Sequence, residues 1–178
     1  MKARILDDPE SVAREVAELV ADAIRAGARS LVLAGGSTPA RAYQLLAEKP
    51  VEWGRVAVLF GDERCVPPEH PESNYLMARR SLLDRVSPAT VHRMPGELGA
   101  ETAAELYEPV VRALSPLDLV LLGMGPDGHT ASLFPGHTML AAEGLVVGVH
   151  DAPKPPPDRV SLTLGALRAA RRVVFVVT

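Results

Sequence analysis

The chain has 178 residues and a formal net charge of −3 at pH 7, and 47% of its residues are hydrophobic and 23% are charged. This composition is typical of an ordinary globular protein that is long enough to bury a sizeable core. Nucleic-acid binding is disfavoured as the main function, because it needs a concentrated basic patch, and 4% aromatic residues are too few for a base-stacking platform.

The sequence shows no sign of a membrane or export address. No run of residues approaches the length of a transmembrane helix, and the N-terminal MKARILDDPE lacks the apolar core of a signal peptide. The single cysteine, Cys65, excludes an internal disulfide framework. We therefore expect a cytoplasmic protein.

The first half of the chain alternates between helices and strands. It is predicted to contain, in order, a helix over 9–27, a strand over 30–36, a helix over 37–49, a strand over 55–63 and a helix over 73–86. The first helix has apolar residues at helical spacing and ends at Gly27. Ser37 and Thr38 are expected to cap a helix that starts near Pro39, and Ser73 is expected to cap the helix that follows it.

The second half continues the alternation and is richer in strands. It is predicted to contain a helix over 100–113, strands over 117–123, 144–150, 159–164 and 171–178, and a short helix over 165–170. Continuous apolar strands that alternate with helices predict a three-layer α/β fold, with a mostly parallel central sheet and helices on both faces.

We expect residues 1–178 to form a single domain, because no repeat or long linker interrupts them. In an α/β fold a helix usually covers the last strand, and none follows the strand that ends at Thr178. A C-terminal piece is therefore expected to lie outside this sequence.

Three apolar strands run into unusual polar loops, which are AGGSTP (34–39), GDERCVPP (61–68) and GMGPDGHT (123–130). In open parallel α/β sheets, ligands bind outside the carboxyl ends of the strands. The three loops are therefore predicted to converge on one site.

The first loop has the features of a phosphate-binding turn. Gly35 and Gly36 allow close approach of the backbone, and Ser37 and Thr38 add hydroxyls at a helix N-terminus. An ordinary strand–turn–helix connection has the same features, so both interpretations stay open. The lysine and the spacing of a P-loop are missing.

The second loop places Asp62, Glu63 and Arg64 together. Carboxylates beside a guanidinium can position sugar hydroxyls and a developing oxyanion. Taken alone, however, such a triplet is more typical of a surface ion-pair cluster. The neighbouring Cys65 is interpreted as a buried structural thiol, because no base has a fixed sequence relation to it.

The third loop matches the dinucleotide-binding pattern G-x-G-x-x-G through Gly123, Gly125 and Gly128. That pattern requires the third glycine to open a helix. Pro135 and Gly136 would end any such helix almost at once, so dinucleotide binding is disfavoured.

The same loop carries Asp127 and His129, which suit acid–base chemistry. Histidine accepts a proton near neutral pH, and Asp127 is placed to accept a hydrogen bond from the other ring nitrogen or to bind substrate. A helix-capping aspartate and a half-buried histidine are the alternative. The histidine spacings show no metal-binding pattern, and no G-x-S-x-G nucleophile elbow is present.

Arg159 begins a strand after the stiff loop APKPPP. An arginine held there can bind a phosphate bidentately. Without other information, a surface position is favoured for Arg159 and for Lys154.

In this order, the motifs AGGSTP, GDERCVP…SNY, GMGPDGHTASLFP and PKPPPDRVSLTL closely resemble the 6-phosphogluconolactonase family, hydrolases of the oxidative pentose phosphate pathway. The resemblance covers almost the whole chain. It implies a Rossmann-like α/β fold, shared with the related glucosamine-6-phosphate deaminases.

The resemblance implies hydrolysis of 6-phospho-D-glucono-1,5-lactone to 6-phosphogluconate without a metal or a cofactor. His129 would activate the water that attacks C1 and return the proton to the leaving ring oxygen. Asp127 would orient His129 or the sugar. Arg64 would stabilise the oxyanion or hold hydroxyls, and Asp62 would position Arg64 or bind a hydroxyl.

Gly35, Gly36, Ser37, Thr38 and Arg159 would hold the 6-phosphate. The family usually continues with a Gly-x-x-Lys segment whose lysine also holds this phosphate, and that segment is absent from these 178 residues. The implied partner is the small lactone, with no nucleic acid and no membrane, and we expect a monomer.

The sequence disfavours two alternatives to the lactonase. The deaminase pattern carries a glutamate five residues after the histidine, where this chain has Phe134, and Asp-Glu-Tyr where this chain has Asp62-Glu63-Arg64. A non-catalytic sugar-phosphate-binding module usually adjoins a helix-turn-helix, which these residues do not show, and the Asp127/His129 pair argues against an inactive site.

Overall fold

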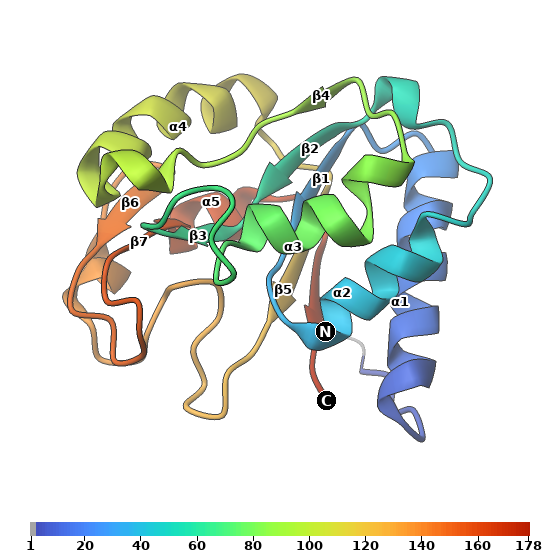
Figure 1. The fold of residues 1–178 in the computed structure, drawn as a ribbon, viewed down its shortest axis with the longest axis horizontal. Coiled ribbons are helices and arrows are strands. Elements are labelled where there is room, and N and C mark those ends of the chain that lie inside the picture. The colour runs from blue at the N-terminus through green and yellow to red at the C-terminus, as the bar shows by residue number, and fades with distance from the viewer. Residues whose placement is uncertain (1–2) are drawn as a thin grey trace.

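The strands form two sheets in the computed structural model, which describes residues 3–178. The strands are β1 (Ser30–Leu33), β2 (Ala57–Phe60), β3 (Asp62–Arg64), β4 (Thr90–Val91), β5 (Leu119–Gly123), β6 (Val146–Val149), β7 (Arg159–Leu162) and β8 (Val173–Val176). The helices are α1 (Pro9–Arg25), α2 (Ser37–Leu46), α3 (Asn74–Ser81), α4 (Ala100–Leu114) and α5 (Leu164–Ala169) (Figure 1).

The larger sheet is parallel throughout, with the strand order β4-β2-β1-β5-β8. From β1 the chain proceeds to β2 and β4 on one side, and later to β5 and β8 on the other side. This reversal is a topological switch point, where the loops after two neighbouring strands diverge and leave a crevice. The predicted α/β fold with a mostly parallel sheet flanked by helices is confirmed.

The smaller sheet is antiparallel, with the order β3-β7-β6. The strands predicted over 144–150 and 159–164 exist, but they do not join the parallel sheet. Their connection over 150–158 is too short for the crossover that parallel neighbours require, which takes about a dozen residues or more. Residues 62–64, predicted as the end of a strand entering a loop, form a separate strand that pairs with β7.

The helix caps predicted from the sequence are confirmed, with one exception. Gly27 lies just after α1 with φ of +101°, and the Ser73 hydroxyl caps α3 by accepting a hydrogen bond from the backbone N–H of Leu76. The expectation that Ser37 and Thr38 cap the next helix is wrong, because both lie inside α2. Gly36, with φ of +114°, turns the chain instead, so α2 starts without a side-chain cap.

The core is a cluster of buried apolar side chains in which β1, β2 and most of β5 are covered. Helices α1 and α2 pack against each other, and α4 packs on β6 and β7 (Figure 1). Among residues 3–178, no helix is long and apolar enough to cross a membrane.

A buried tyrosine ties α4 to the sheet. The Tyr107 hydroxyl accepts a hydrogen bond from the Phe60 N–H at 2.9 Å and donates one to the His92 carbonyl at 3.0 Å. We predict that Tyr107→Phe lowers the free energy of unfolding by about 1–3 kcal/mol, because two buried backbone groups lose their partner.

Urea denaturation measures this loss. The control is Leu106→Ala, a neighbouring α4 residue that is 53% exposed, for which a change within about 0.5 kcal/mol is expected. Equal stabilities of Tyr107→Phe and wild type would contradict the assignment.

Candidate active site

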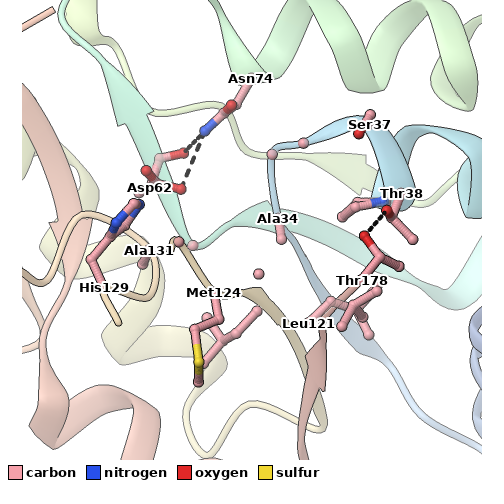
Figure 2. Close-up of a pocket in the computed structure, with 18 of the residues that line it drawn as sticks. Ala34, Ser37, Thr38, Asp62, Asn74, Leu121, Met124, His129, Ala131 and Thr178 are labelled. Carbon is pink, nitrogen blue, oxygen red and sulfur yellow. Dashed lines mark hydrogen bonds between the residues drawn. The ribbon is translucent and has the colours of Figure 1, made fainter. Parts of the chain in front are cut away.

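A cavity of about 270 Å³ opens at the carboxyl ends of β1 and β5, at the switch point of the parallel sheet. Residues of all three polar loops line it, which confirms that the loops converge. Eight of the nine predicted site residues are among the lining residues, namely Gly35, Gly36, Ser37, Thr38, Asp62, Arg64, His129 and Arg159. Figure 2 shows Ser37 and Thr38 on one side of the cavity and Asp62 and His129 on the other. The ninth, Asp127, is not among the described lining residues, but it is hydrogen-bonded to His129, which is one of them.

Asp127 and His129 form a hydrogen-bonded pair, with 2.6 Å between Asp127 Oδ1 and His129 Nδ1. This bond lowers the pKa of Asp127 to about 2, so the carboxylate stays ionised at neutral pH. In the neutral imidazole, the ionised carboxylate favours the tautomer that carries its proton on Nδ1, and Nε2 of that tautomer is a hydrogen-bond acceptor. Lys154 Nζ lies 3.4 Å from the same carboxylate oxygen.

The glycines of this loop make room for the pair. The Gly125 N–H donates to the His129 carbonyl and the Gly128 N–H donates to the Gly125 carbonyl, both at 2.9 Å. A Cβ atom at Gly125 would lie 2.2 Å from His129 Cε1 and 2.6 Å from Asp127 Oδ1. No helix follows Gly128 within residues 129–136, so the local structure required for dinucleotide binding is not formed.

Phe134 packs against His129. Its buried ring lies against the His129 ring, with 4.6 Å between the centroids, and the Arg159 guanidinium carbon lies 5.6 Å from its centroid. An apolar ring therefore contacts both polar groups.

Arg64 and Arg159 are direct cross-strand neighbours in the register of β3 and β7. Within residues 3–178 neither guanidinium forms an ion pair with a carboxylate, and both donate to backbone carbonyls instead. Burial, followed by the charge of Arg64, lowers the pKa of Arg159. Two like charges opposite each other are unfavourable in a sheet, so this pair makes the cavity an attractive site for an anion.

Arg159 is held in place by its own loop. It is only 3% exposed, and it donates to the carbonyls of Pro156 at 3.0 Å and Lys154 at 2.9 Å. The interpretation of Arg159 as a surface residue is therefore wrong.

The Asp62–Glu63–Arg64 triplet is not an ion-pair cluster, because side chains alternate between the two faces of β3. Asp62 and Arg64 line the cavity. The buried Glu63 carboxylate instead accepts hydrogen bonds from the Ser73 hydroxyl and from the N–H groups of Arg64, Asn74 and Tyr75. Burial raises the pKa of Glu63, against the effect of these donors.

Asp62 is fixed from two sides. Its Oδ2 accepts from the Ser132 hydroxyl at 2.7 Å, and its Oδ1 accepts from Asn74 Nδ2 at 3.2 Å. Cys65 does not line the cavity among the described residues. It is half-buried, and burial raises its pKa to about 11, which keeps it a thiol and agrees with a structural role.

The glycine loop after β1 is anchored by a second buried tyrosine. The Tyr43 hydroxyl accepts from the Ala34 N–H at 2.8 Å and donates to the Ala34 carbonyl at 2.9 Å. Thr38 Oγ1 lies 3.0 Å from Thr178 Oγ1 at the same end of the cavity (Figure 2). The start of α2, which has no side-chain cap, faces this end.

Sequence reasoning missed Asn74. It recognised SNY only as part of a motif and Ser73 as a helix cap, whereas Asn74 lines the cavity between Asp62 and Gly35. The signals in the sequence were its place directly after that cap and its membership of the SNY motif.

A family model described as "Glucosamine-6-phosphate isomerases/6-phosphogluconolactonase" matches residues 7–178. The chain belongs to this family. A probable 6-phosphogluconolactonase 3 of rice, described as chloroplastic, is 40% identical over 95% of this chain and 58% of its own length. The 6-phosphogluconolactonase of Streptomyces coelicolor is 38% identical over 94% of this chain and 77% of its own length.

Solved structures show the same relationship. A crystal structure of 6-phosphogluconolactonase from Thermotoga maritima matches with a TM-score of 0.88 and 33% identity, over 97% of this chain and 81% of that chain. The chain thus spans less than two thirds of the length of the rice relative and about four fifths of the bacterial structure.

Because Arg64 and Arg159 form no ion pair within residues 3–178, we predict that a bound anion stabilises the fold. We expect inorganic phosphate to raise the Tm of the wild type at constant ionic strength. At ten times the Kd, binding contributes about 1.4 kcal/mol, which corresponds to about 3–6 °C for a chain of this size.

Differential scanning calorimetry with chloride as the reference salt measures the shift. Arg64→Ala should reduce it, and the control Arg80→Ala, which changes an exposed arginine, should not. An equal shift in Arg64→Ala, or none in the wild type, would argue against an anion site between these arginines.

Proposed function

We propose that this chain hydrolyses 6-phospho-D-glucono-1,5-lactone to 6-phosphogluconate. The observation that carries the proposal is the His129–Asp127 pair, whose acceptor nitrogen belongs to a cavity with two unpaired arginines. Family membership and the names of the relatives support the same substrate.

In the proposed reaction His129 Nε2 takes a proton from water as the oxygen attacks C1 of the lactone. The Asp127 carboxylate, hydrogen-bonded to Nδ1, stabilises the imidazolium that forms. The tetrahedral oxyanion develops beside Arg64, whose charge no carboxylate within residues 3–178 neutralises by an ion pair. Collapse breaks the bond from C1 to the ring oxygen, and His129 returns the proton to that oxygen. Water is the only co-reactant.

The 6-phosphate is assigned to the other end of the cavity. The uncapped start of α2, with Gly35, Gly36, Ser37 and Thr38, offers backbone N–H groups and hydroxyls to an anion. Arg159 supplies positive charge to the same cavity. This anchor acts on the rate by positioning C1 against His129.

Phe134 favours the lactonase over the deaminase. It occupies the place where the deaminase pattern has a glutamate, and its ring packs directly on His129. Among the described residues, Asp127 is then the one carboxylate bonded to His129.

We predict that His129→Ala lowers kcat by about 10²–10⁴-fold, because a positioned base contributes that much to proton transfer. Lactone loss is followed against the spontaneous rate in buffer. The matched control is His92→Ala, which changes a histidine that does not line the cavity. Unchanged activity of His129→Ala would rule out the proposed base.

We predict that Gly125→Ala lowers kcat by about 100-fold, because the added Cβ displaces the His129 ring and misplacement by about 1 Å has an effect of this size. Gly54→Ala is the control, since its Cβ would contact nothing within 4 Å. Wild-type activity in Gly125→Ala would show that the position of the ring is not critical.

A further inference from the structure

The amide of Asn74 has an unused hydrogen-bond acceptor in the cavity. Asn74 is only 5% exposed and lines the cavity. Within residues 3–178 its Oδ1 accepts no hydrogen bond, while its Nδ2 donates twice. Oδ1 does not belong to the fully buried side-chain atoms that lack a partner, so it is open to the cavity. An acceptor that is open to a cavity and has no protein donor is free to accept a hydrogen bond from a ligand.

The orientation of this amide follows from its neighbours. Nδ2 lies 3.0 Å from the Asp62 carbonyl oxygen and 3.2 Å from Asp62 Oδ1 (Figure 2). Both partners are acceptors, so the atom facing them is the NH₂ group and the oxygen faces away from Asp62.

The backbone of Asn74 is held as firmly as its side chain. Its N–H donates to the buried Glu63 carboxylate at 2.8 Å, and the preceding Ser73 caps α3. These hydrogen bonds therefore fix the direction of the amide oxygen before any ligand binds.

That direction leads toward the glycine loop. A Cβ atom at Gly35 would lie 2.1 Å from Asn74 Oδ1, so the oxygen occupies the space that a side chain would fill. Asn74 thus lies between Asp62 and the loop assigned to the phosphate.

We propose that Asn74 Oδ1 accepts a hydrogen bond from a ring hydroxyl of the lactone, and that Asn74 is a specificity residue for polyhydroxylated substrates. The inference rests on the proposed function. A ring hydroxyl between C1 and C6 is a donor at the middle of the substrate. A site with an acceptor built for a hydroxyl discriminates against an analogue that lacks it.

The test compares kcat/KM for the full lactone and for its 2-deoxy, 3-deoxy and 4-deoxy analogues, all 6-phosphorylated. We expect the wild type to lose about tenfold or more on one analogue. Asn74→Ala should lose a similar factor on the full lactone but little further on that analogue.

The matched control is Ser132→Ala, which removes the other hydrogen bond to Asp62 and leaves Asn74 Oδ1 in place. It should lower kcat/KM for all four substrates by a similar factor. If Asn74→Ala does the same, Asn74 acts only through Asp62 and the inference is overturned.

Two further outcomes are decisive. A wild type that hydrolyses all three analogues as well as the full lactone overturns the inference, whether or not Asn74→Ala folds. A wild type that hydrolyses none of the four above the buffer rate overturns the proposed function, and the inference with it.

Discussion

The reversal of strand order between β1 and β5 is the constraint on which the site depends. The chain leaves β1 for β2 on one side and returns at β5 on the other, so the loops that follow these two neighbouring strands diverge and leave a crevice. The first loop contributes the start of α2 and the second contributes His129. Backbone topology thus brings the start of α2 and His129 to the same crevice.

The antiparallel sheet contributes two positive charges to the cavity. Pairing of β3 with β7 places Arg64 opposite Arg159, an arrangement that is unfavourable without an anion. Loop carbonyls and the Phe134 ring stabilise the buried Arg159, while Arg64 donates to the Glu72 carbonyl. A phosphorylated lactone bound in this cavity would bring negative charge to the two arginines. Its charge would offset their mutual repulsion, which is a physical reason for the fold to place them opposite each other.

Local patterns predicted most elements and the meeting of the three loops, because apolar periodicity and parallel topology determine both. The roles within GDER were not predictable, since they depend on β3 pairing with a strand far along the chain. Asp62 is bonded to Ser132, 70 positions away, and no local pattern shows that bond. Asn74 was missed for the same reason, because its role appears only when Asp62 and Gly35 lie on either side of it.

The proposed lactonase activity depends on His129, which is hydrogen-bonded to Asp127 and lies in one cavity with Arg64 and Arg159. The most direct measurement is the initial rate of 6-phospho-D-glucono-1,5-lactone loss at increasing concentrations of the 178-residue chain. We expect the rate to exceed the spontaneous rate and to rise in proportion to protein concentration. A rate equal to that of buffer at every protein concentration would contradict it.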